Sequence, residues 1–89
     1  MIARRAVLSG RVQGVGFRFF AERAAREAGV AGWVRNRPDG TVETLAQGDP
    51  ASVARYFERL RTGPAGSRVV SLLEEEAALQ SYDSFEITG

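Results

Sequence analysis

The segment GRVQGVGFR, residues 10–18, contains three glycines and ends in an arginine, residue types that can bind an anion. Glycine at positions 14 and 16 permits the backbone dihedrals of a loop whose N–H groups converge on one ligand. Arg18 can hold phosphate oxygens through two parallel hydrogen bonds. Taken alone, however, a G-x-G pattern is weak, and a tight turn followed by a solvated arginine is its more ordinary explanation. Arg18 is the residue that distinguishes the two interpretations.

The amino-acid composition excludes several kinds of site. The chain has no cysteine and therefore no disulfide, and it has no histidine, so zinc and most transition metals lose their main ligands. All 12 basic residues are arginine, and the absence of lysine excludes Schiff-base chemistry and the lysine-dependent P-loop. The net charge of +1 argues against an extended nucleic-acid surface. We therefore expect no metal and no cofactor.

Hydrophobic periodicity predicts the elements that must position this loop. Apolar residues alternate over residues 4–12, which indicates a half-buried strand. Helical spacing of apolar residues over 17–28 predicts an amphipathic helix that stops at Gly29. Two strand-like runs follow at 31–37 and 41–48, and the Pro-Asp-Gly sequence between them predicts a hairpin turn.

The second half of the chain predicts one more helix and two strands. Asp49 is expected to cap a helix over 50–62, followed by a strand over 68–76 that runs into a solvated acidic patch, and by a short last strand over 84–88. The order is β-α-β-β-α-β plus an extra strand. Crossovers of one hand place both helices on one face of an antiparallel sheet. We therefore expect a single α+β domain over 1–89 with the ferredoxin-like α/β sandwich fold.

Two motifs together resemble the signatures of a known family. The segment GRVQGVGFR, followed by GWVRNRPDGTV at residues 32–42, is similar to the two signature motifs of the acylphosphatases. These are small cytoplasmic enzymes of ferredoxin-like fold that hydrolyse carboxyl-phosphate anhydrides. The resemblance extends through GDPASVARYFERL at 48–60 and GPAGSRV at 63–69, and is looser in the C-terminal segment. The two motifs at this spacing are far more specific than either one alone.

The resemblance implies a role for residues of both motifs. Arg18 would bind the phosphoryl group and Asn36 would position the attacking water, although the residues alone leave Asn36 equally open as a turn former. Backbone amides of the phosphate-binding loop would surround the phosphate oxygens; the loop residues are Gln13, Gly14, Val15, Gly16, Phe17 and Arg18. Where some members of the family carry a hydroxyl side chain after the asparagine, this chain has Arg37.

A site of this composition favours a substrate whose leaving group departs unaided. Without histidine or cysteine, the chain has neither an obvious general base nor a covalent phosphoryl carrier. Phosphoryl transfer through a loose transition state depends mainly on positioning and electrostatics. A carboxylate, whose conjugate acid has a pKa of about 4, leaves without protonation, whereas an alkoxide requires a general acid. The composition therefore favours a small acyl phosphate over a phosphomonoester.

Two other functions remain open at this point. The segment QGVGFRFF, residues 13–20, resembles the glycine and aromatic pattern of an RNA-binding RNP1 motif, although that motif lies on a third strand with exposed aromatics. A second alternative is a protein-interaction or regulatory domain that keeps the phosphate loop without physiological hydrolysis. Similar domains begin larger hydrogenase-maturation proteins, but this chain lacks their zinc-finger cysteines.

The sequence also carries expectations about location and partners. The N-terminal residues lack the apolar block of a signal peptide, and no apolar run approaches the roughly 20 residues of a membrane span. We therefore expect a cytoplasmic monomer that binds a small-molecule acyl phosphate, with no nucleic-acid or membrane partner.

Overall fold

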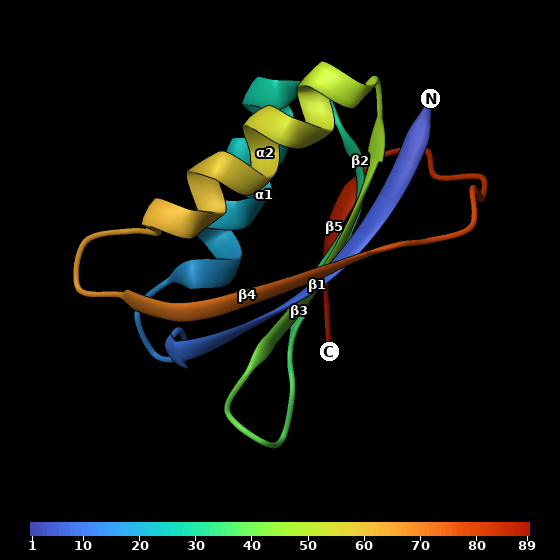
Figure 1. Cartoon of the computed structure of the whole chain (residues 1–89). Coiled ribbons are helices and arrows are strands. Elements are labelled where there is room, and N and C mark those ends of the chain that lie inside the picture. Colours follow the sequence, from blue (N-terminus) through green and yellow to red (C-terminus); the bar gives the residue numbers. More distant parts are fainter.

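The computed structural model describes residues 1–89 and forms a five-stranded sheet with two helices. The elements in chain order are β1 (Ile2–Arg11), α1 (Phe17–Ala28), β2 (Ala31–Asn36), β3 (Val42–Gly48), α2 (Pro50–Thr62), β4 (Arg68–Glu76) and β5 (Phe85–Thr88). The strand order is β4-β1-β3-β2-β5, and both helices lie on the same face of the sheet (Figure 1). The predicted ferredoxin-like fold is confirmed. Neither helix is long and apolar enough to cross a lipid bilayer.

The last strand makes the sheet mixed rather than wholly antiparallel. The pairs β1–β3, β1–β4 and β2–β3 are antiparallel as expected, but β5 runs parallel to β2. Phe85, at the start of β5, is buried and packs against Tyr56 of α2 with ring centroids 5.5 Å apart. The extra strand therefore completes the core as well as extending the sheet.

Helix α1 packs against the sheet through a face of mostly small side chains. Its buried residues are Phe17, Ala21, Ala24, Ala25 and Ala28. Alanine combines high helix propensity with a short side chain, so the helix axis can lie close to the strands. Gly29 ends the helix in the left-handed conformation and donates its N–H to the carbonyl of Ala25.

Helix α2 has the predicted bounds, but Asp49 does not cap it with its side chain. The Asp49 carboxylate makes no hydrogen bond to the first-turn amides and instead accepts a 3.4 Å hydrogen bond from the hydroxyl of Ser52. Asp49 is exposed, so water can solvate its carboxylate without help from the helix. The start of the helix is therefore fixed by Pro50 at its first position and by the Val53 N–H, which donates to the Asp49 carbonyl.

The predicted solvated acidic patch at the end of β4 is wrong for Glu74, which is half-buried and paired with two arginines, whereas Glu75 and Glu76 are exposed. Glu74 accepts hydrogen bonds from Arg4 of β1 at 3.0 Å and from Arg61 of α2 at 3.2 Å. Glu75 accepts a hydrogen bond from Arg5 at 2.7 Å. A pattern read along one strand could not show the arginines on its neighbours.

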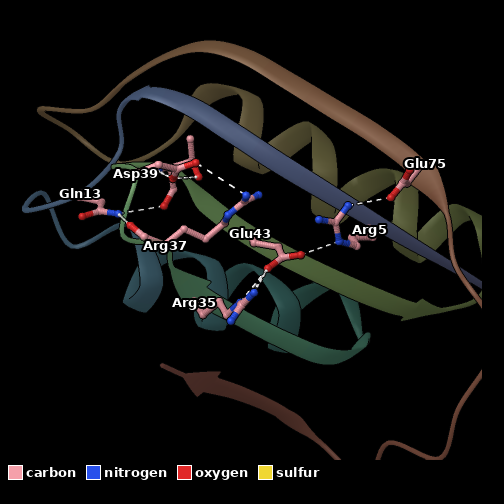
Figure 2. A network of polar contacts seen from close by, with 8 residues as sticks. Arg5, Gln13, Arg35, Arg37, Asp39, Glu43 and Glu75 are labelled. Atoms are coloured by element: carbon pink, nitrogen blue, oxygen red, sulfur yellow. Dashed lines mark hydrogen bonds and ion pairs between the residues drawn. The ribbon is translucent and has the colours of Figure 1, made fainter.

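The sheet face away from the helices carries a buried carboxylate between two arginines. Glu43 of β3 has a side chain only 6% exposed and accepts hydrogen bonds from Arg5 at 2.5 Å and from Arg35 at 2.7 Å (Figure 2). We call Arg5, Arg35 and Glu43 the Glu43 cluster. Burial raises the pKa of the Glu43 carboxyl, but the hydrogen bonds and charges of the two arginines outweigh burial and hold it below its usual value. Both carboxylate oxygens are thus satisfied within the protein.

Candidate active site

The loop between β1 and α1 has the backbone conformation that its glycines predict. Gly14 has φ +74° and Gly16 has φ +76°, both in the left-handed region. A Cβ atom at either position would meet no other atom within 4 Å. Glycine is therefore required here by the backbone conformation and not by a lack of space. The open space in front of both residues leaves room for a ligand to approach the backbone.

The N–H groups of this loop have no acceptor within the protein. None of those in residues 13–16 donates to another group of the chain. Residues 17–19 form the first turn of α1, where the helix itself offers no acceptor, and the N-cap residue Gly16 has no side chain to supply one. A series of free amide donors at the positive end of a helix favours binding of an anion.

A small cavity of about 120 Å³ lies beside the loop. The residues that line it are Val12, Gly14, Gly16, Phe17, Arg18, Phe19 and Asn36. They come from the loop that follows β1, the start of α1 and the end of β2. The two sequence motifs, which are separate along the chain, therefore meet at one place in the fold.

Arg18 is the charged residue of this lining, and no carboxylate neutralises it. Its guanidinium takes part in none of the ion pairs of the structure, and it makes no side-chain hydrogen bond. Arg18 also lies in the first turn of α1, where the helix dipole disfavours a positive charge unless an anion is present. An unpaired cation at this position is typical of an anion-binding site.

A larger hollow at the β5 edge of the sheet is less suited to phosphate. It has a volume of about 260 Å³, and both charged residues that line it, Asp83 and Glu86, are acidic. Negative side chains repel a phosphoryl group, so the smaller cavity beside Arg18 is the candidate site. Nowhere does the structure gather three histidine, cysteine, aspartate or glutamate side chains that could hold a metal ion.

Asn36, the last residue of β2, lines the same cavity and has an unsatisfied polar atom. Its side-chain oxygen Oδ1 is buried and has no hydrogen-bond partner in the protein. A buried acceptor without a donor costs stability, and such atoms are rare in folded proteins. The carboxamide of Asn36 is thus free to bind water or a polar group of a ligand.

Gln13 connects the loop to the turn that follows Asn36. Its side-chain Nε2 donates to the carbonyl of Arg37 at 2.8 Å and to the carbonyl of Thr41 at 2.9 Å (Figure 2). The Gln13 side chain therefore does not line the cavity but holds the loop against the β2–β3 hairpin.

The turn itself is held together by Asp39. The backbone N–H and the hydroxyl of Thr41 both donate to Asp39 Oδ1, at 3.0 and 2.6 Å, and Arg37 Nη2 lies 3.7 Å from Asp39 Oδ2. The hydrogen bonds from Thr41, with a smaller effect of the Arg37 charge, lower the pKa of the Asp39 carboxyl. Arg37 is thus directed toward the turn and is not part of the cavity lining.

Comparisons with known proteins agree with this geometry. A family model for acylphosphatase matches residues 4–87. The chain belongs to the acylphosphatase family. The acylphosphatase of Koribacter versatilis is 49% identical over 97% of this chain and 79% of its own length, and that of Archaeoglobus fulgidus is 40% identical over 98% of both chains. The crystal structure of acylphosphatase from Bacillus subtilis matches all of both chains with a TM-score of 0.97 at 38% identity.

These matches confirm both the family and the enzyme class that the two motifs predict. The structure brings Arg18, Asn36 and the two loop glycines together around one cavity, and their roles in catalysis stay predictions. Val15, also assigned to the loop, packs its side chain partly against the hydrophobic core. It can therefore contribute to an acylphosphatase site only through its backbone.

Sequence reasoning missed two features of this acylphosphatase-family site. Phe19 lines the cavity and is 67% exposed, although the sequence predicted no role for it. The signal was available, because Phe19 falls outside the apolar stripe of α1. The hydrogen bonds of the Gln13 side chain could not be predicted from the sequence, because their acceptors are backbone carbonyls that any residue could supply.

Proposed function

We propose that this chain hydrolyses the carboxyl-phosphate bond of acyl phosphates and releases a carboxylate and inorganic phosphate. The observation that carries the proposal is an unpaired arginine, Arg18, in a cavity beside free backbone amides. Asn36, whose side-chain oxygen has no partner, lines the same cavity. Membership of the acylphosphatase family supports the substrate class.

Arg18 and the loop amides bind the phosphoryl group in this mechanism. The guanidinium offers two parallel donors that match two phosphate oxygens. The free N–H groups of residues 13–18 and the positive end of α1 supply further donors without any rearrangement of the loop. Donors that are already in place stabilise the charge that develops on the oxygens in the transition state.

Asn36 orients the attacking water. Its carboxamide, whose oxygen has no partner within the protein, holds the water so that a lone pair of the water oxygen faces phosphorus. As the new P–O bond forms, the bond between phosphorus and the carboxylate oxygen breaks on the opposite side, with the three atoms in line. An amide cannot take the water's proton at neutral pH, so the proton passes to a phosphate oxygen or to solvent.

The cavity lining also supports an acyl phosphate rather than a phosphomonoester. It contains no carboxylate, thiol or imidazole, so no lining group can protonate a departing alkoxide. A carboxylate, with a conjugate-acid pKa of about 4, departs as the anion. The cavity is small, about 120 Å³, and we place the phosphoryl group in it. The acyl part would lie outside, beside the exposed ring of Phe19.

The environment of the aromatic residues argues against the RNA-binding alternative. In an RNP1 motif the aromatic rings lie exposed on the sheet, where bases stack on them. Here Phe17 is 2% exposed and packs against Phe20, with ring centroids 6.1 Å apart. The motif opens α1 and directs these two rings into the interior.

The test is hydrolysis of benzoyl phosphate, acetyl phosphate and a sugar phosphate, in the presence of a chelator. The wild type should hydrolyse the two acyl phosphates and leave the sugar phosphate intact. Arg18→Gln should lose about 10³-fold or more in kcat/KM, as other preorganised charge donors do. Arg23→Gln is the matched control, because Arg23 is an exposed arginine of the same helix without an ion pair.

Background rates for the wild type on both acyl phosphates would contradict the proposal. If inorganic phosphate then still raised the melting temperature of the wild type and not that of Arg18→Gln, the chain would be a phosphate-binding domain without hydrolysis.

A further inference from the structure

The carboxamide of Gln13 forms an unusual bridge between two parts of the site. A single group, the side-chain NH₂, donates to two backbone carbonyls, those of Arg37 at 2.8 Å and Thr41 at 2.9 Å. These two carbonyls flank the tip of the β2–β3 hairpin, and the donor belongs to the first residue of the phosphate-binding loop. Gln13 is half-buried, so solvent competes only in part for these hydrogen bonds.

The turn that accepts the Gln13 hydrogen bonds is held by further hydrogen bonds of its own. The Arg37 N–H donates to the Thr41 carbonyl at 2.9 Å, and the Gly40 N–H donates to the Arg37 carbonyl at 3.1 Å. Asp39 accepts two further hydrogen bonds from Thr41. Asn36 directly precedes this turn and is paired with Val42 across the hairpin. A group fixed to the turn is therefore fixed relative to Asn36.

No other hydrogen bond or ion pair joins residues 12–16 to residues 36–41. The loop and the strand end that carries Asn36 are otherwise connected only through packing and through the sheet. The Gln13 side chain is therefore the one hydrogen-bonded link between the phosphate-binding loop and the turn that follows Asn36.

We propose that Gln13 is a positioning residue that fixes the phosphate-binding loop against the strand end carrying Asn36. The inference rests on the proposed function, in which the loop holds the phosphoryl group and Asn36 holds the water. In-line attack requires both to keep a fixed separation and direction, and a misplacement of about 1 Å can cost about 100-fold in rate. The side chain of Gln13 acts through Asn36 and the loop, without contact with the reacting atoms.

The experiment compares Gln13→Met with Gln47→Met in the full chain. Methionine keeps approximate length and volume but donates no hydrogen bond. Gln47 is a matched control because its side chain also forms two hydrogen bonds to the backbone. It donates to the Gln80 carbonyl at 2.7 Å and accepts from the Gln80 N–H at 2.9 Å. Gln47 is not part of the cavity lining. We expect both variants to lower the melting temperature.

The kinetic constants separate a positioning role from a structural one. Gln13→Met should lower kcat for benzoyl phosphate by about 10- to 100-fold, while competitive inhibition by inorganic phosphate changes by less than about 3-fold because Arg18 and the loop amides still bind it. Gln47→Met should keep the wild-type kcat. An unchanged kcat in Gln13→Met, or an equal loss in Gln47→Met, would overturn the inference while leaving the proposed function intact.

A double-mutant cycle with Asn36→Ala tests the route through which Gln13 acts. If Gln13 serves to place Asn36, its replacement in the Asn36→Ala background should cost less than about 3-fold in kcat, because coupled residues are not additive. Losses that multiply in full would overturn the inference. A wild type that does not hydrolyse acyl phosphates would overturn the proposed function itself, and the inference with it.

Discussion

Arg5 and Arg18 lie in two regions that differ in whether the arginine is paired with a carboxylate. Arg5 donates to Glu43 and to Glu75, and within the Glu43 cluster both carboxylate oxygens accept hydrogen bonds from arginines. Arg18 has no partner and lies beside free loop amides and the unsatisfied oxygen of Asn36. The same side-chain type is thus used to stabilise the fold in one region and left available in the other. Unsatisfied polar groups gathered in one cavity indicate a ligand site more directly than the charges themselves do.

The largest difference between the two regions should appear when arginine is replaced by lysine. Arg18→Lys should lower kcat/KM for acyl phosphates by about 10³-fold, because one ammonium group cannot replace a planar guanidinium that holds two oxygens. Arg5→Lys, in the Glu43 cluster, should leave kcat/KM unchanged. Steady-state kinetics of both variants check this, and comparable losses in the two would remove the contrast. The melting temperature of Arg18→Lys should equal that of the wild type, since Arg18 has no intramolecular partner to lose.

The next largest effect should come from Asn36→Ala. We expect kcat to fall by about 100-fold, the scale on which a positioning group contributes, with a much smaller change in inhibition by inorganic phosphate. The free energy of unfolding should not decrease, because the substitution removes a buried acceptor that has no donor. Kinetics and urea unfolding of the same preparation measure both. A variant with wild-type kcat would exclude Asn36 from the mechanism.

In the Glu43 cluster the effect should be on stability and not on rate. Glu43→Gln leaves the charges of Arg5 and Arg35 without their shared carboxylate and weakens two charged hydrogen bonds. We expect a loss of about 2 kcal/mol in the free energy of unfolding, measured by urea titration, and an unchanged kcat at 25 °C. If kcat fell together with stability, the two regions would be coupled and the comparison would not hold.

The smallest effect concerns the pH dependence of stability. The pKa of Glu43 is lower in the folded protein than its unfolded value of about 4.3, so its contribution is fully present above that value and is lost as pH falls through the folded pKa. The wild type should therefore lose stability more steeply than Glu43→Gln below about pH 4. Urea midpoints between about pH 3 and pH 7 show the difference. Parallel curves for the two proteins would mean that Glu43 does not contribute to acid unfolding.

Most of the fold could be predicted because its signals are local. Helix stops at Gly29 and Gly63, the Pro-Asp-Gly turn and the alternation of apolar residues each act within a few positions of the chain. The parallel pairing of β5 and the partners of Glu74 depend on residues that are distant in sequence and close only after folding. A single sequence contains no direct measure of such contacts.

The candidate site also combines features that local sequence signals predict with features that depend on the folded chain. The positive φ of Gly14 and Gly16 followed from their position between a strand and a helix. The assignment of Asn36 required resemblance to the acylphosphatases, because its buried oxygen and its position beside Arg18 are properties of the folded chain. The two hydrogen bonds of Gln13 end on backbone carbonyls, which every residue carries, so no sequence pattern could have revealed them.

The position of β1 inside the sheet has a consequence for synthesis of the protein. Of the strands in this sheet β1 is synthesised first, yet its outer neighbour is β4, and the pair Arg4 and Glu74 is separated by 70 residues. At about 5 to 20 residues per second, β1 waits about 4 to 14 seconds for this neighbour to be translated. Topologies dominated by such distant pairings also fold slowly. An interior strand of the finished sheet is therefore, in the nascent chain, an uncovered edge available to other chains.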